Sequence, residues 1–144
     1  MSSHYIPKPV RHSVAKAANY RCGYCLTPQS IVGPLLEIDH IIPEALGGTA
    51  DEDNLWLACP TCNGAKSDRI QAIDPESGEN VSFFNPRLDS WTEHFIWLNE
   101  GAVIAGLTPK GRATVTALNM NHPDIVAARQ LWVTVGWHPP ADTI

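Results

Sequence analysis

The stretch from 22 to 62 decides the fold. It begins with Cys22-Gly-Tyr-Cys25, continues through Glu37-Ile-Asp39-His40-Ile-Ile-Pro43, and ends with Cys59-Pro-Thr-Cys62. Each Cys-x-x-Cys turn presents two sulfur atoms on one side, so two turns supply the four ligands of a tetrahedral zinc ion. The chain has no further cysteine. In a reducing compartment this favours one structural zinc site, with disulfides or a redox role as the alternative.

The two cysteine pairs are separated by 33 residues, whereas a plain zinc ribbon needs about 15 to 20. The extra length contains Asp39 and His40, a hard oxygen ligand beside a base that titrates near neutral pH. Zinc would then hold both ends of a hairpin that carries reactive side chains. Neighbouring residues on a regular strand point to opposite faces, so Asp39 and His40 can serve one site only if the strand ends or twists there.

Short elements surround these motifs. The apolar periodicity and the positions of proline predict a helix over 7–19, strands over 35–42 and 54–58, and a helix that begins at Pro60. The local order is therefore strand, loop, strand, helix, with Cys62, Asn63, Lys66 and Arg69 on the second helix.

A cluster of turn-forming residues over 74–80 divides the chain into two parts. We expect a catalytic unit over 1–73, with a basic N-terminal helix, and an α/β extension over 74–144 that packs on it. The extension is predicted to contain a hairpin from strands 95–98 and 102–107, followed by helices over 109–120 and 123–135. Its aromatic side chains are interpreted as core rather than as platforms for nucleic-acid bases: Trp91, Phe95, Trp97, Trp132 and Trp137.

The net charge of −5 is unfavourable for a protein that binds nucleic acid, but the charges are unevenly distributed. Four basic residues and no acidic residue precede Glu37. A local basic face can bind phosphate even when the total charge is negative. The alternative is that these are ordinary solvated helix charges. No apolar run is long enough to span a membrane and no signal pattern is visible, which indicates a cytoplasmic protein without a membrane partner.

Together these motifs resemble the HNH endonuclease family of the ββα-metal type. The resemblance covers residues 10–70, about half of the chain, and its parts occur in the order of the family. It implies an α+β fold with a ββα core and a four-cysteine zinc site. The last motif position, which is often His in this family, is occupied by Asn63, giving the His-Asn-Asn variant. The matching segments are Cys22/Cys25, Glu37–Pro43, Gly47-Gly48, Asp53-Asn54-Leu55, Cys59/Cys62 and Asn63–Lys66.

The resemblance also implies a role for each matched residue. His40 would be the general base, and Asn54 would bond across the loop to orient it. Asp39 and Asn63 would hold one divalent ion. A carboxylate beside an amide oxygen prefers a hard cation, so Mg²⁺ or Mn²⁺ is expected at this position.

Basic residues near these motifs are candidates for substrate binding. Lys66 lies one helical turn after Asn63 and is expected to contact phosphate, as is Arg69. Arg11 and Lys16 lie on the predicted N-terminal helix. Each of them can equally be a surface residue without a ligand.

These observations predict a metal-dependent endonuclease that hydrolyses phosphodiester bonds, with DNA as the expected substrate. No second recognition domain is visible, so specificity would be weak or supplied by a partner or a homo-oligomer. Two alternatives stay open. One is a non-catalytic zinc module that binds nucleic acid, and the other is a nuclease that cleaves RNA.

Overall fold

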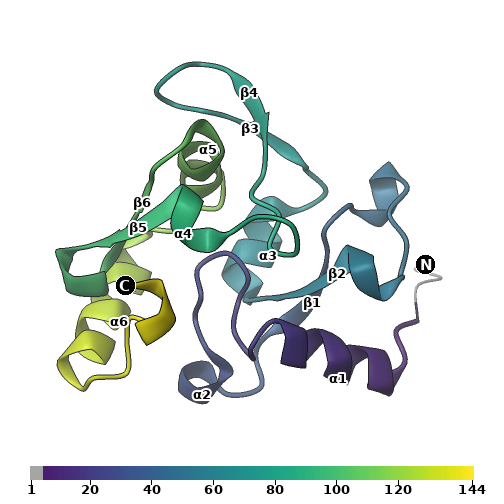
Figure 1. Cartoon of the computed structure of the whole chain (residues 1–144), viewed down its shortest axis with the longest axis horizontal. Helices are drawn as coiled ribbons and strands as arrows, with labels where there is room; N and C mark the ends of the chain where they lie inside the picture. Colours follow the sequence, from purple (N-terminus) through teal and green to yellow (C-terminus); the bar gives the residue numbers. More distant parts are fainter. Residues whose placement is uncertain (1–4) are drawn as a thin grey trace. The chain divides into compact units, whose positions relative to one another are not determined.

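The chain forms two compact units in a computed structural model that describes residues 5–144 (Figure 1). The first unit runs to Ile70 and also includes Asn85–Arg87. The second unit comprises Gln71–Phe84 and Leu88–Ile144. Within the described residues, no helix has the length and apolar character needed to cross a membrane.

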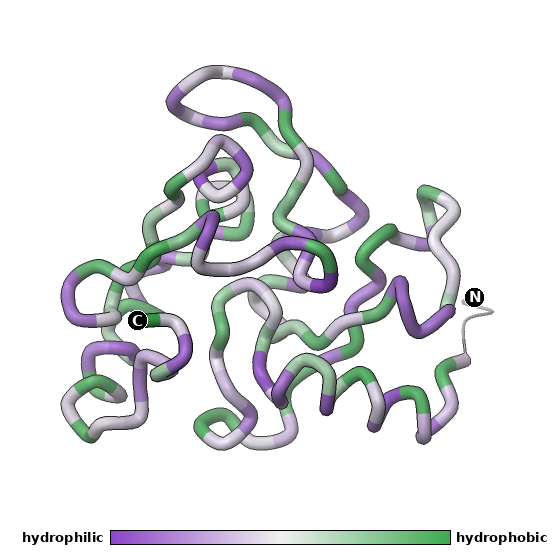
Figure 2. The backbone as a smooth tube through the Cα atoms, in the orientation of Figure 1, coloured by the Kyte–Doolittle hydropathy of each residue, from purple (hydrophilic) through white to green (hydrophobic). Residues whose placement is uncertain are grey.

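The first unit begins with helix α1, Lys8–Ala17, which starts where Pro9 occupies one of the first helical positions. Figure 2 shows hydrophilic and hydrophobic residues alternating along this helix, as expected for a helix with one buried face. Val14 on that face is fully buried and packs with Ile6 and Leu55 to form a small apolar core. A four-residue helix, α2, Gln29–Val32, follows in a segment without a predicted element.

The centre of the first unit is the predicted strand–strand–helix arrangement. Strand β1, Glu37–His40, pairs antiparallel with β2, Leu55–Ala58, so that His40 lies opposite Leu55 and Glu37 opposite Ala58. Helix α3, Pro60–Lys66, follows at once and packs against β1. Pro60 stands at the start of α3, where its missing N–H has no intrahelical acceptor to lose.

The loop between β1 and β2 contains two 3₁₀ turns, Glu44–Leu46 and Glu52–Asn54. Gly47 ends the first turn in a left-handed conformation, with φ 89°, which costs glycine little. Gly48 is required for a different reason. A Cβ atom there would lie 1.6 Å from the carbonyl oxygen of Ile42, so the two backbone segments approach more closely than any other residue allows.

The second unit contains two hairpins and two longer helices. The predicted hairpin and helices are present, whereas the first hairpin and the four-residue helix α4 have no counterpart in the sequence-based expectation. In chain order the elements are β3 (Gln71–Ile73), β4 (Asn80–Ser82), α4 (Trp91–His94), β5 (Phe95–Leu98), β6 (Val103–Gly106), α5 (Pro109–Ala117) and α6 (Pro123–Thr134). Each hairpin is antiparallel, with β3 paired to β4 and β5 paired to β6.

Aromatic residues pack together in this unit. Phe95 is buried and contacts Phe84 and Trp91, with ring centroids 5.1 Å apart in both cases. The prediction that the tryptophans are core residues was wrong for Trp137, whose exposed fraction is 62%. Trp137 follows the end of α6, beyond the buried face of that helix.

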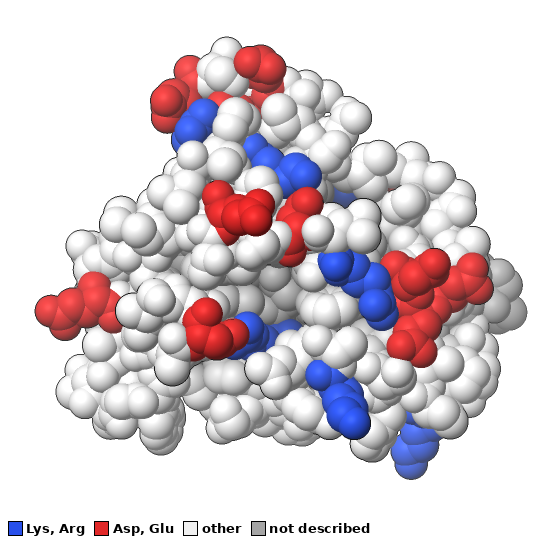
Figure 3. All heavy atoms as spheres, viewed as in Figure 1, with Lys and Arg blue, Asp and Glu red and all other residues white. Residues whose placement is uncertain are grey.

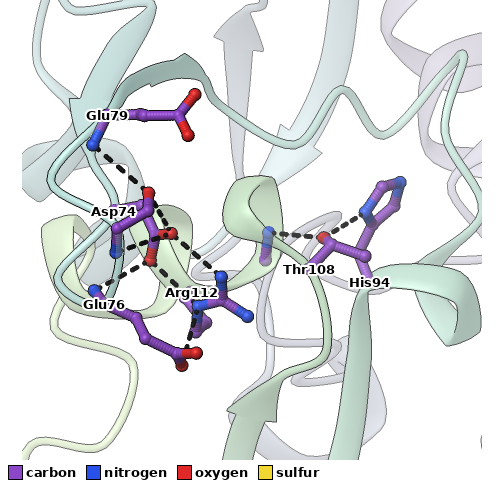
Figure 4. Close-up of polar contacts among 8 residues, drawn as sticks. Asp74, Glu76, Glu79, His94, Thr108 and Arg112 are labelled. Carbon is purple, nitrogen blue, oxygen red and sulfur yellow. Dashed lines mark hydrogen bonds and ion pairs between the residues drawn. The ribbon is translucent and has the colours of Figure 1, made fainter.

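An ion pair anchors the turn between β3 and β4 (Figure 4). The Asp74 carboxylate accepts two hydrogen bonds from the Arg112 guanidinium, each 2.9 Å long, and further bonds from the backbone N–H groups of Glu76 and Ser77. The turn cluster that the sequence marked as a boundary is therefore the loop of a hairpin.

Candidate active site and metal centre

The four cysteine sulfur atoms meet in the first unit. Their Sγ atoms all lie within 4.8 Å of one another, and the Sγ atoms of Cys25 and Cys59 are 3.7 Å apart. A tetrahedral zinc ion with Zn–S bonds of about 2.3 Å places its sulfur ligands about 3.8 Å apart. Backbone N–H groups point at the sulfurs, from Tyr24 to Cys22 and from Cys62 to Cys59, at 3.4 Å each. The donor set therefore fits the predicted structural zinc.

Burial and the neighbouring thiols shift the pKa values of Cys22, Cys25 and Cys62. Hydrogen bonds from the neighbouring thiols, with that from Cys22 the largest cause, lower the pKa of Cys25 well below its usual value. Burial raises the pKa of Cys22, and hydrogen bonding among the thiols raises that of Cys62. Zinc binds the thiolate form of cysteine, so its binding would release protons from this cluster.

His40 stands at the last position of β1 with its imidazole partly exposed, at 19%. Its Nε2 atom lies 3.9 Å from Oε1 of Glu44, which follows in the first turn of the loop. Its backbone carbonyl accepts a hydrogen bond from Lys66. The imidazole is therefore reachable from solvent while the backbone that carries it is held.

Asn54 forms hydrogen bonds across the loop between β1 and β2. Its side-chain oxygen accepts from the backbone N–H of Ile42, at 2.9 Å, and its amide group donates to the carbonyls of Ile42 and Thr49, at 3.0 and 2.8 Å. The backbone N–H of Ile41 also donates to the Asn54 carbonyl. These bonds tie the residues that follow His40 to the start of β2.

Asp39 lies elsewhere than expected. Its exposed fraction is 2%, and both carboxylate oxygens accept hydrogen bonds from buried groups. Tyr24 Oη donates to Oδ2 at 2.7 Å, and Lys66 Nζ donates to Oδ1 at 3.1 Å. The structure thus directs Asp39 into the interior, because adjacent residues on β1 project to opposite faces. Asp39 and His40 are neighbours in sequence without presenting their side chains to one open face.

Lys66 corrects a second expectation. The sequence predicted a phosphate contact, but the Lys66 side chain is buried, with an exposed fraction of 2%. Its ammonium group donates to Asp39 and, at 2.8 Å, to the carbonyl of His40. An ammonium group enclosed in this way is not available to a phosphate.

Glu37, which the sequence left open as a further metal or water contact or as a solvated strand residue, contacts Asn63. Asn63 lies on the face of α3 that meets β1, and its Nδ2 atom donates to Glu37 Oε1 at 3.0 Å. Glu37 is two residues before Asp39, so the two side chains project from the same face of β1. Unlike Asp39, Glu37 is exposed.

The predicted basic residues lie at the surface. Arg11, Lys16 and Arg69 are exposed. Arg11 Nε donates to the carbonyl of Ile6 at 3.1 Å, and Arg69 Nη2 donates to the carbonyl of Ala65. The visible face in Figure 3 shows the basic side chains in separate groups, whereas several acidic side chains gather on the right.

Arg87 belongs to the first unit although it is distant in sequence. Its guanidinium lies 5.1 Å from the ring centroid of Trp56 and donates to the carbonyls of Leu55 and Glu52. Arg87 therefore stabilises the start of β2 through hydrogen bonds, although it lies outside the ββα segment in sequence.

Comparison with known proteins agrees with this geometry. Residues 22–69 match the family model described as HNH endonuclease. The chain is also similar to the Septu protein PtuB of Bacillus mycoides (strain KBAB4), with 29% identity over 126 residues. That match covers 69% of this chain and 42% of the relative, so the chain spans less than half of the relative's length. No solved structure matches.

The matched segment contains both cysteine pairs, the β1–β2 hairpin and α3, which are the parts that the motifs predicted. A sequence match and an observed ββα arrangement with four clustered sulfurs thus point to the same family. Over residues 22–69 the chain is therefore similar to an HNH endonuclease domain, in its sequence motifs and in its strand–strand–helix arrangement.

Proposed function

We propose that the first unit is a metal-dependent endonuclease that hydrolyses phosphodiester bonds, with DNA as its substrate. The observation that carries the proposal is the placement of His40. Within the family-matched segment, its imidazole is accessible at the end of β1, while hydrogen bonds from Lys66 and to Asn54 hold the peptide group that joins His40 to Ile41. A general base must be both accessible to water and fixed in direction.

His40 takes a proton from the attacking water in this proposal. Asn54 acts through the backbone of residues 41 and 42, so it is a positioning residue and does not touch the substrate. A bound Mg²⁺ or Mn²⁺ would supply charge stabilisation at the scissile phosphate.

The family resemblance implies Asp39 and Asn63 as ligands of such an ion, but both oxygens of Asp39 already accept hydrogen bonds inside the protein, so the accessible oxygens are those of Asn63 and Glu37. Asn63 donates its amide N–H to Glu37, which turns its Oδ1 atom toward other partners. Because Asp39 is enclosed by Tyr24 and Lys66, Glu37 is the more accessible carboxylate of the three side chains. Carboxylate and amide oxygens suit a hard cation.

Exposed basic residues are the proposed contacts to the nucleic-acid backbone: Arg11, Lys16 and Arg69. Because the net charge of the chain is −5, attraction to nucleic acid would come from these few basic residues. Salt screens such phosphate contacts, so the affinity for nucleic acid should fall steeply as the salt concentration rises. Sequence preference would come from a partner or a second copy of the chain. The four clustered cysteines support a proposed location in a reducing compartment such as the cytoplasm.

The test is nicking of supercoiled plasmid by the purified full chain, with Mg²⁺ or Mn²⁺ added or omitted. His40→Ala should reduce the rate by about 100-fold or more, because general-base catalysis typically contributes that factor. The matched control is His12→Ala, which removes an exposed imidazole from α1. Zinc content is measured for all three proteins.

Equal nicking by wild type and His40→Ala would refute the assignment of the base. Tight plasmid binding without nicking would favour the alternative of a non-catalytic zinc module. Cleavage of single-stranded RNA, but not plasmid, would identify the chain as an RNA nuclease.

A further inference from the structure

We propose that Lys66 is a positioning residue for His40, held in place by a buried cluster that it forms with Asp39 and Tyr24. We call these three residues the Asp39 cluster. The inference rests on the proposed role of His40 as general base. It replaces the expected phosphate contact of Lys66 with a different role.

The geometry of one ammonium group carries the proposal. Lys66 Nζ donates to the carboxylate of Asp39 at 3.1 Å and to the backbone carbonyl of His40 at 2.8 Å. Lysine presents three donors, so two of them are directed to consecutive residues of β1. Lys66, on α3, thereby holds both the side chain of Asp39 and the backbone of His40.

Electrostatics holds this ammonium in place. Lys66 and Asp39 are each 2% exposed, and a buried charge is tolerated only when it is paired and hydrogen-bonded. Tyr24 supplies the remaining donor to Asp39 at 2.7 Å. The cluster therefore contains one positive charge, one negative charge and one neutral hydroxyl.

The cluster also joins the zinc centre to the catalytic strand. Tyr24 lies between Cys22 and Cys25 in the first cysteine turn, and Lys66 ends the helix that carries Cys62. Each of the two cysteine pairs is therefore linked to Asp39 by one nearby side chain, Tyr24 for the first pair and Lys66 for the second. The hydrogen bond from Lys66 fixes the backbone carbonyl of His40. The imidazole of His40 projects from the face of β1 opposite to that of Asp39.

The first experiment separates positioning from phosphate binding. Lys66→Met keeps an unbranched side chain, one heavy atom shorter, and removes its charge. If Lys66 positions His40, kcat for plasmid nicking should fall about 10- to 100-fold, because small misplacements of a catalytic group cost rates of this order, while KM stays within about threefold of wild type. The matched control is Lys110→Met, which breaks the partly exposed ion pair with Asp89 in the second unit and should leave kcat and KM unchanged.

A raised KM with unchanged kcat would assign Lys66 to phosphate binding and overturn the proposal, as would wild-type kinetics. Since Lys66→Met leaves a buried carboxylate without its cation, Tyr24→Phe serves as a second variant. It removes one hydrogen bond to Asp39 and keeps the ion pair. We expect kcat to fall several-fold with KM and zinc content unchanged, and an unchanged kcat would contradict the role of the cluster.

The second experiment needs neither a variant nor activity. An amine-reactive acylating reagent is applied to the native full chain, and modification of each lysine is measured by mass spectrometry. Lys8 and Lys16, which are exposed, should react at least about tenfold faster than Lys66, and the difference should vanish in denaturant. Equal native reactivity would overturn the proposal. If the wild type does not nick plasmid, the proposed function fails, whereas this labelling still decides whether Lys66 is enclosed.

Discussion

In the second unit, the charge state of Asp74 depends mainly on one partner, Arg112. Arg112 is the largest cause that holds the pKa of Asp74 well below its usual value, assisted by Ser77 and by backbone N–H groups of Glu76 and Ser77. The ionised form is thus favoured in the folded chain. Because the folded pKa is lowered, this stability is fully present above the unfolded value of about 4 and is lost as the pH falls through the folded value.

We therefore predict that the wild type loses thermal stability as the pH falls below about 4, and that Asp74→Asn has a shallower loss over the same range. At neutral pH, Asp74→Asn should melt at a lower temperature because the bidentate contact with Arg112 is gone. Thermal unfolding followed by circular dichroism from pH 7 to pH 2 measures both effects. Parallel curves for the two proteins would show that Asp74 does not contribute to acid sensitivity.

At the scale of elements, the loop between β1 and β2 and the helix α3 place different demands on glycine. Gly48 approaches the carbonyl of Ile42 so closely that a Cβ atom has no room, and the same carbonyl accepts from Asn54. Gly64 lies on the exposed side of α3, where a Cβ atom would have no neighbour within 4 Å among the described residues outside its own turn of helix. The two glycines therefore test loop geometry and helix propensity separately.

Gly48→Ala should destabilise the first unit by about 1–3 kcal/mol, as overpacking against a backbone atom does, and should lower nicking because the loop follows His40 directly. Gly64→Ala should be neutral or should stabilise by up to about 1 kcal/mol, the usual gain of alanine over glycine inside a helix. Denaturant unfolding measures both changes. Equal stabilities of the two variants would contradict the close approach at Gly48.

For the whole molecule, the two units have separate sources of stability. The first has a small apolar core around Val14, and four clustered sulfurs that fit zinc. Structural zinc in small domains contributes an apparent binding energy of about 10–16 kcal/mol, so its loss should be decisive there. The second unit is built around buried aromatic residues such as Phe95 and needs no metal in this interpretation.

We predict that a zinc chelator removes amide protection from β1, β2 and α3 while β5 and β6 keep theirs. Hydrogen–deuterium exchange with mass spectrometry, before and after chelation of the full chain, measures this difference. Zinc re-addition should restore the pattern and serves as the control. Simultaneous loss in both units would show that the chain unfolds as one cooperative body.

Much of the ββα segment could be predicted because its signals are local. Two Cys-x-x-Cys turns, a β-branched run stopped by Pro43, and Pro60 after a cysteine each specify backbone over a few residues. The hairpin β3–β4 was not predicted, since its strands of three residues are too short to show alternation. The turn cluster between them was visible, but not the pairing across it.

The sequence by itself determined the order of elements and the four sulfur ligands, because these depend on spacing along the chain. The bond of Asn54 across the loop was implied only by the family resemblance. Tertiary structure alone decided that Lys66 is buried against Asp39 and that Glu37 meets Asn63. Spacing places a residue on a face of a strand or helix, but whether that face meets solvent, a carboxylate or an ammonium group depends on which distant element packs there.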